Sequence, residues 1–307
     1  MKLEGIHHIT CITGDAPRNV EFYVGLLGLR MVKKTVNQDV PTIYHLFYAD
    51  EEGDPGSDLT FFEYPGAGRG RAGVGMIHRI VWRLGTDDAI AFWEDRLRSA
   101  GVVVEREADA IRFSDPEGLG LEFRVVNTDD DPLMAHHPDI PDEYALQGFD
   151  GARAYSADPE HSRDLLEQAM GFTSTGDQSF ECRGDNRSSW WAYDESRTLG
   201  EQGAGTVHHI AWSSRMDDHL AWRQRVNEAG MQPTPVIDRF WFKSIYYREP
   251  SGVLFEIATL GPGFTADEPL EHLGEHLTLP PNFEHLRDEL EKTLTPLPDP
   301  IALRSKS

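Results

Sequence analysis

Histidine pairs occur at two places in this chain, each inside a short apolar run. The first pair lies in GIHHIT, residues 5–10, and the second in TVHHIAW, residues 206–212. Imidazole is a common ligand of divalent transition metals, and a strand holds such a side chain in a fixed direction. Because successive strand residues point to opposite faces of a sheet, we expect only one histidine of each pair to face a given cavity.

The elements that carry these pairs belong to a fourfold repeat. Each repeat begins with an apolar strand, continues with a helix and then adds further strands. The first strands begin GIHHIT, GMIHRIVW, GARAYS and GTVHHIAW, at residues 5, 75, 151 and 205. This order predicts an α+β fold of four βαβββ modules, in which one helix packs on each small curved sheet.

The four modules predict two domains with a connector between them. Modules one and two would form an N-terminal domain, 1–127, and modules three and four a C-terminal domain, 149–260. The stretch 128–148 is acidic, contains proline and lacks periodicity, so it is predicted to be the connector. The tail, 261–307, is predicted to contain one amphipathic helix after Pro281.

A comparison of the four first strands favours the second residue of each doublet as a metal ligand. The first position holds His7, His78, Arg153 and His208 in module order. The second position holds His8, Arg79, Ala154 and His209. Histidine at the first position occurs in three modules, so that position is less specific to one site. Only modules one and four have histidine at the second position.

A glutamate also recurs in the last strand of a module. Module four has Glu256, module two has Glu122, and module one has Glu63 in a less certain register. His8, His209 and Glu256 would supply two imidazoles and one carboxylate. With three positions left open, this is the facial triad of non-haem Fe(II) oxygenases. His45, in the alternating strand TIYHLFYAD, could line a cavity or face a neighbouring strand, and we favour the second.

These motifs resemble the vicinal-oxygen-chelate superfamily of glyoxalase, bleomycin resistance and extradiol dioxygenase proteins. FYVGLLGL resembles its helix-to-strand signature, and DPEG and EPSG resemble its turn before the last strand. The stretches GIHHITCITGDAPRNVEFY, DRFWFKSIYYREPSGVLFEIAT and LTLPPNFEHLRDEL resemble the branch of ring-cleaving dioxygenases that act on hydroquinones. The resemblance covers nearly the whole chain. It implies two vicinal-oxygen-chelate domains with a C-terminal helical tail.

The resemblance also implies a cofactor, a reaction and roles for individual residues. Fe(II), or alternatively Mn(II), would be held by His8, His209 and Glu256, so that modules one and four meet around the metal. Catalytic roles are implied for His208, Arg239 and Tyr246, and flanking roles for His7 and Thr10. The substrates would be O2 and a substituted hydroquinone or related dihydroxybenzene, whose ring opens beside a hydroxylated carbon.

Two other functions remain open from the sequence. If Glu63 also binds the metal, two histidines and two glutamates make a closed octahedral set. That set is typical of a glyoxalase-like isomerase or thiol transferase, which uses no O2. The other alternative is a non-catalytic protein that binds aromatic compounds, because some relatives of the fold bind drugs without a metal.

Composition restricts the partners. The formal net charge of −23 over 307 residues disfavours nucleic acid and anionic membranes, which repel an acidic surface. No stretch approaches the roughly 18 apolar residues that a membrane span needs. The two cysteines and the absence of a signal-peptide core favour a cytoplasmic protein. The sequence does not fix the oligomeric state, although a homo-oligomer is compatible with this fold.

Overall fold

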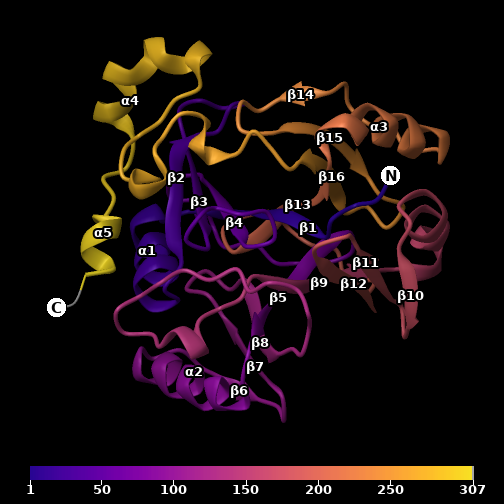
Figure 1. Ribbon diagram of the computed structural model, residues 1–307, viewed down its shortest axis with the longest axis horizontal. Coiled ribbons are helices and arrows are strands. Elements are labelled where there is room, and N and C mark those ends of the chain that lie inside the picture. Colours follow the sequence, from indigo (N-terminus) through magenta and orange to yellow (C-terminus); the bar gives the residue numbers. More distant parts are fainter. Residues whose placement is uncertain (306–307) are drawn as a thin grey trace.

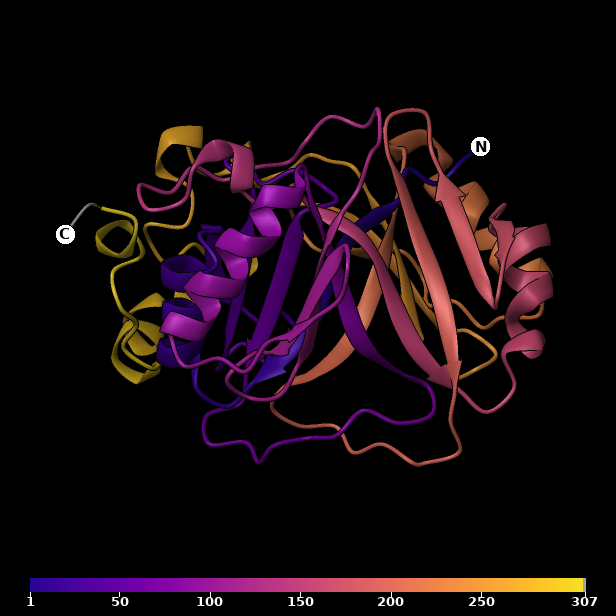
Figure 2. The same ribbon diagram turned by 90° about the horizontal axis from the view of Figure 1, so that it is seen from below.

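Two curled eight-stranded sheets make up the computed structural model, which describes residues 1–305 (Figure 1). In Figure 2 the strands fill the centre of the molecule and the helices lie on the outside. The final residues of the predicted tail, 306–307, lie outside the described part. Curled sheets with few helices confirm the α+β prediction.

The first sheet combines the two ends of the chain. Its order is β14-β15-β16-β13-β1-β4-β3-β2. The strands are β1 (Ile6–Thr13), β2 (Arg30–Val36), β3 (Tyr44–Ala49), β4 (Asp58–Glu63), β13 (Thr206–Ser214), β14 (Ile237–Asp238), β15 (Lys243–Arg248) and β16 (Leu254–Thr259). Antiparallel pairing of β1 with β13 joins modules one and four, so the strands that carry the two histidine pairs are neighbours.

The second sheet combines modules two and three. Its order is β10-β11-β12-β9-β5-β8-β7-β6, with antiparallel β5 and β9 at its centre. The strands are β5 (Met76–Leu84), β6 (Glu105–Arg106), β7 (Ala110–Ser114), β8 (Gly120–Val125), β9 (Phe149–Ser156), β10 (Thr173–Gly176), β11 (Ser179–Arg183) and β12 (Ser188–Glu195). Each sheet thus takes one module from each predicted domain, and we retain the domain boundaries as a proposal.

Helices follow the first strand of each module, as the repeat predicts. The α-helices are α1 (Ala16–Val20), α2 (Asp87–Ser99), α3 (His219–Glu228), α4 (Arg287–Thr293) and α5 (Pro300–Leu303). Two π-helical turns occupy Glu21–Leu26 and Leu165–Ala169. Short 3-10 turns occupy Asp142–Tyr144, Pro159–Ser162, Met216–Asp218, Phe264–Ala266, Leu270–His272 and Pro281–Leu286.

Local chemistry explains where two of these helices begin. The side chain of Asp15 accepts a hydrogen bond from the backbone N–H of Arg18 at 3.2 Å, which caps α1. The hydroxyl of Thr86 accepts from Ala89 N–H at 3.3 Å and caps α2 in the same way. Fixed helix positions matter because α2 packs on β5, β7 and β8 of the second sheet, and α3 packs on β16 of the first.

The helical tail lies against the first sheet (Figure 1). Leu277 forms a bridge with Lys34 of β2, and Arg304 after α5 forms a 2.6 Å ion pair with Glu51. Leu279 and Leu290 are buried together with Val36. Among residues 1–305, none of the helices has the length and apolarity that crossing a membrane requires.

Candidate metal centre

Three predicted ligands converge where β1, β13 and β16 lie side by side. His8, His209 and Glu256 are buried, and their donor atoms lie within 4.8 Å of one another. The Nε2 atoms of the two histidines are 3.3 Å apart. Oε2 of Glu256 lies 3.2 Å from Nε2 of His8 and 2.9 Å from Nε2 of His209. No other group of three or more His, Cys, Asp or Glu side chains within residues 1–305 could hold a metal ion.

The carboxylate of Glu256 fits a cation at this place. The side chain is fully buried, and neither of its oxygens accepts a hydrogen bond within the described chain. Burial acts to raise the pKa of this carboxyl, but His8 and His209 hold it well below its ordinary value. Burying an ionised carboxylate without a partner is costly. Two imidazole nitrogens and one carboxylate oxygen form a donor set that suits a divalent transition metal.

A hydrogen-bond chain orients the ring of His8. Nδ1 of His8 is 2.9 Å from Nδ1 of His7, and Nε2 of His7 is 3.1 Å from the carbonyl oxygen of Thr259. Because that carbonyl only accepts, Nε2 of His7 carries the hydrogen. Burial lowers the pKa of His7 to about 3, so its Nδ1 is free to accept from His8. The lone pair of His8 Nε2 therefore points toward the other two ligands.

The second doublet has the same arrangement. Nδ1 of His208 lies 2.8 Å from Nδ1 of His209. Burial lowers the pKa of His208 to about 4, so the neutral ring accepts from Nδ1–H of the ligand. Both rings line one cavity, which the alternation of a regular strand does not allow. The expectation that only one histidine of a pair faces the cavity is therefore wrong for this doublet.

The physical reason is a β-bulge at the first histidine of each pair. In the β1–β13 pairing, Ile6 lies opposite Trp212 but His8 lies opposite Ala211, so His7 has no partner. The pairing shifts again beyond Thr10, which leaves His208 without one. An extra residue on one strand breaks the alternation of side-chain directions. The bulges thus explain why a histidine doublet occurs twice.

The ligands open onto a small cavity of about 240 Å³ between modules one and four. Its aromatic and apolar walls come from Phe47, Phe62, Trp241, Phe242, Tyr246 and Leu254. Its polar side chains, besides the clustered histidines, are Asn37, Gln38, Asp39, His45, Thr234 and Arg239. A volume at the lower end of ligand pockets suits a single ring better than a larger molecule.

The other predicted residues divide into two groups. Arg239 and Tyr246 line the cavity, and Nε of Arg239 donates to Oη of Tyr246 at 3.2 Å. The Tyr246 ring lies 5.6 Å from the ring of His209, centre to centre. His7 and Thr10 are not among the lining residues and lie behind the ligands. Thr10 accepts a hydrogen bond from the hydroxyl of Thr60 at 2.8 Å.

Glu63 lies outside the ligand group. In the parallel pairing of β1 with β4, Thr10 pairs with Thr60, and Glu63 lies three residues further along. Oε1 of Glu63 instead accepts from the backbone N–H of Ala16 at 3.3 Å. The alternative with Glu63 as a fourth ligand is therefore not supported.

Most of the side chains that complete the cavity, Asp39 and Phe62 among them, were not predicted from the sequence. Asp39 and Phe62 line the cavity although nothing in their local sequence singled them out. His45 does bond to a neighbouring strand, with Nε2 2.9 Å from Thr60, but its ring also lines the cavity. The alternation of β3, which puts His45 and Phe47 on one face, was the available signal.

The second sheet holds no equivalent centre. In the first sheet, Ala211 pairs with the ligand His8. The corresponding pair in the second sheet is Val81 with Gly151, so Gly151 occupies the position of a ligand. The sequence alignment of module three was therefore wrong by three residues. Nη1 of Arg79 lies 3.6 Å from Glu122, at the place of the other two ligands.

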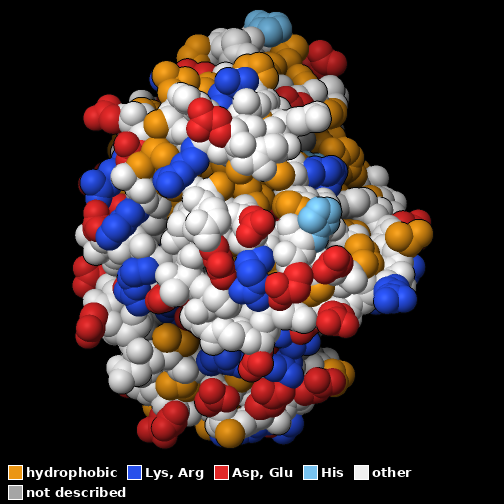
Figure 3. Space-filling model, turned by 90° about the vertical axis from the view of Figure 1, so that its right-hand side faces the viewer, with side chains coloured by type: hydrophobic (Ala, Val, Ile, Leu, Met, Phe, Trp, Pro, Cys, Tyr) orange, Lys and Arg blue, Asp and Glu red, His pale blue; other side chains and the backbone are white. Residues whose placement is uncertain are grey.

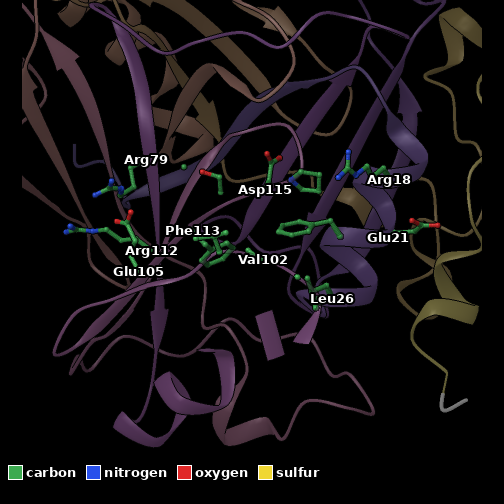
Figure 4. A pocket seen from close by; sticks show the side chains of 16 residues that line it. Arg18, Glu21, Leu26, Arg79, Val102, Glu105, Arg112, Phe113 and Asp115 are labelled. Carbon is green, nitrogen blue, oxygen red and sulfur yellow. The ribbon is translucent and has the colours of Figure 1, made fainter. Parts of the chain in front are cut away.

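A larger open groove of about 650 Å³ borders this sheet (Figure 4). Its walls include Arg79 and Arg112, which both pair with Glu122. Phe113 and Val102 lie between Arg112 and Leu26 in the view. No metal-binding group of described residues lies there, so the smaller cavity is the candidate site.

Comparisons with known proteins agree with this architecture. Residues 5–123 match the model of the "Glyoxalase/Bleomycin resistance protein/Dioxygenase superfamily". The protein named "Putative ring-cleaving dioxygenase MhqO" of Bacillus subtilis (strain 168) is 40% identical over 96% of this chain and 97% of its own length. The chlorohydroquinone/hydroquinone 1,2-dioxygenase of Sphingobium indicum is 32% identical over 98% of both chains.

Solved structures share the fold over nearly the whole chain. A crystal structure from Bacillus subtilis subsp. subtilis str. 168, described as a "putative dioxygenase", has a TM-score of 0.90 at 39% identity and covers 97% of this chain and 98% of its own. Glyoxalase I from Zea mays has a TM-score of 0.56 at 17% identity and covers 89% of this chain and 96% of its own. The maize enzyme shares the fold alone.

Proposed function

We propose, from the premise that this chain belongs to the glyoxalase/bleomycin resistance protein/dioxygenase superfamily, that it is an Fe(II)-dependent extradiol-type dioxygenase acting on a hydroquinone or related dihydroxybenzene. Two Bacillus subtilis relatives are each named "Putative ring-cleaving dioxygenase", and the Sphingobium relative is named a chlorohydroquinone/hydroquinone 1,2-dioxygenase. The observation that carries the proposal is the buried group of His8, His209 and Glu256 at a ring-sized aromatic cavity. Mn(II) is the alternative metal, and we propose a cytoplasmic location.

A metal held by these three residues would supply a redox-active centre at which a phenolate and O2 meet side by side. The protein's side chains determine the shape of the cavity beside that centre. Phe62 and Phe242 give the cavity apolar walls, and the low polarity of such walls strengthens electrostatic interactions near them. The aromatic walls also restrict a flat ring to few orientations, which lowers the entropic cost of reaching a reactive geometry.

Two hydrogen-bond donors face this cavity. Nδ1 of His208 is occupied by His209, so the hydrogen of neutral His208 is on Nε2, where it can be donated to a reacting oxygen. Burial raises the pKa of Tyr246, so its hydroxyl stays protonated and can donate as well. Arg239 supports that hydroxyl by donating to it. Negative charge that develops on oxygen during ring cleavage would be stabilised by such donors.

The alternatives have less support. A glyoxalase-like isomerase or thiol transferase would need a fourth protein ligand, and Glu63 is bonded to the start of α1 instead. A binding protein without catalysis would not need the buried ligand set. The Sphingobium relative, which is named for chlorohydroquinone and hydroquinone, favours para-dihydroxybenzenes over catechols.

O2 uptake by anaerobically Fe(II)-loaded protein tests the proposal. Methylhydroquinone and chlorohydroquinone are offered beside catechol, with His209→Ala as the control. Rapid uptake with the hydroquinones that disappears in the variant is expected. Uptake with catechol alone would correct the substrate class, and no uptake from protein that holds iron would refute the dioxygenase.

A further inference from the structure

A threonine stands where the symmetry of the first sheet would place a fourth ligand. On β13, the residue two positions after His209 pairs with Glu256. On β1, the residue two positions after His8 is Thr10, which pairs with Thr60. Thr60 is thus the counterpart of Glu256 and offers a hydroxyl in place of a carboxylate. The position that a fourth protein ligand would occupy in this sheet is therefore not filled by a carboxylate.

A hydrogen-bond chain leads from this position into the cavity. The hydroxyl of Thr60 donates to Oγ1 of Thr10 at 2.8 Å, and its oxygen lies 2.9 Å from Nε2 of His45. The only hydroxyl hydrogen of Thr60 is used toward Thr10, so Nε2 of His45 has to be the donor in the second bond. Nδ1 of the neutral ring is then an acceptor, and no described residue donates to it.

The surroundings keep the His45 ring fixed and neutral. It packs against Phe47 and Phe62, with ring centres 4.0 and 4.4 Å away. Burial, with His8 and His209 nearby, lowers the pKa of His45 well below its ordinary value, so the ring is neutral before substrate binds. A phenolate beside the ring would raise this pKa again, because a neighbouring negative charge favours the protonated form. His208 cannot serve as an acceptor in the same way, because its Nδ1 is already bonded.

Building on the proposed function, we infer that Nδ1 of His45 accepts the proton of the substrate hydroxyl that faces His8 and His209. The phenolic O–H bond breaks, its electron pair stays on the oxygen, and the proton bonds to Nδ1. Thr60 and Thr10 position the ring by holding Nε2–H. His45 is then a catalytic residue that prepares the phenolate, and no oxidant takes part in this step.

The test follows phenolate formation without O2. Nitrohydroquinone, whose phenolate absorbs at longer wavelength than the phenol, is mixed anaerobically with Fe(II)-loaded protein at a pH at which the free compound is neutral. The wild type should form the bound phenolate rapidly. In His45→Leu we expect a rate roughly 100-fold lower, the usual contribution of a general base. Thr60→Val, which frees the ring to turn, should give a smaller loss.

His45→Gln is the second variant, since its amide keeps a bond to Thr60 but cannot take up a proton at neutral pH. It decides the result if His45→Leu does not fold or does not hold iron. Rates in the loaded variant within about threefold of wild type would overturn the inference. Failure of the proposed function is distinguishable, because it would appear as rapid phenolate formation by the wild type without O2 uptake.

Discussion

Asp39 and Arg239, 200 residues apart in the chain, form a two-point ion pair at the cavity. Nη1 of Arg239 lies 3.1 Å from Oδ1 of Asp39, and Nη2 lies 2.9 Å from Oδ2. Arg239 is the one Lys or Arg among the described residues that line this cavity. Since its charge is matched by Asp39, a carboxylate on the substrate would meet no unpaired cation. The pair therefore favours uncharged ring substituents.

Asp39→Asn should change this preference. The wild type is expected to use methylhydroquinone far better than 2,5-dihydroxybenzoate. The variant leaves the guanidinium without its anion, so the ratio of the two kcat/KM values should shift toward the acid by about tenfold, as one charge-assisted hydrogen bond predicts. Asp217→Asn, which removes an exposed carboxylate in the turn before α3, controls for net charge. An unchanged ratio would show that Asp39 does not select the substrate.

The face of the molecule shown in Figure 3 has no continuous basic area that would attract an acid. Acidic and basic side chains are interspersed on this face. Within the cavity, Arg239 is the one cation among the described lining residues, and the Asp39 variant tests selection by charge at a single residue.

Glu256→Gln and Glu63→Gln compare two glutamates in the last strands of their modules. The first variant replaces a buried carboxylate that faces two imidazole nitrogens, so it should retain less than about a tenth of the bound iron. The second alters a bond to the start of α1 and should keep wild-type iron content. Iron per chain is measured after gel filtration. Loss of iron in both variants, with the fold intact, would revive the four-ligand alternative.

His7→Ala and His208→Ala test the role of the bulged histidines. Each ring accepts Nδ1–H from a ligand, so its removal should weaken iron binding about 10- to 100-fold without removing a ligand. His78→Ala is the matched control, because His78 holds the same position in the second sheet and bonds to Asp194. Competition with a chelator measures the affinities. Equal iron affinities in all three variants would show that the first histidine of each doublet contributes to packing alone.

The sequence predicted the modules and the three side chains that come together in the structure, because both depend on pattern and pairing. Repeats of strand and helix predict the sheets, and the equivalence of His8 with His209 survives a bulge that occurs in both strands. The prediction that failed was the register of the first strand of module three relative to the other modules. Gly148 has the same positive φ as Gly5, 82° against 81°, so it begins module three, whereas the sequence alignment chose Gly151.

Contacts between distant segments of the chain could not be predicted from the sequence either. The Asp39–Arg239 pair joins loops of modules one and four, and no local motif records it. Glu63 illustrates the same difficulty, since a three-residue difference in β4 decides between a metal ligand and a bond to a helix start. Strand alternation alone cannot choose between these positions.

The carboxylate of Asp130, in the predicted connector, should make the free energy of unfolding depend on pH in the acid range. This carboxylate accepts from Nη1 of Arg83 at 2.8 Å and from the N–H of Ser188 at 3.0 Å. Burial acts to raise its pKa, but these bonds lower the pKa to about 2. Because the folded value lies below the unfolded value of roughly 3.9, the stabilisation is complete above about pH 4 and is lost as pH falls toward 2.

Asp130→Asn should therefore reduce the free energy of unfolding by roughly 2–3 kcal/mol at pH 7, because charge-assisted hydrogen bonds are lost. The difference from wild type should shrink as the pH falls from about 4 toward 2, because the unfolded wild type takes up a proton at Asp130 in this range whereas the folded protein does so only near pH 2. Urea unfolding at a series of pH values measures both quantities. Glu160→Gln, which removes an exposed ion pair with Arg163, should have little effect at any pH. A difference that stays constant over the whole range would mean that packing, rather than the charge of Asp130, holds the connector to the second sheet.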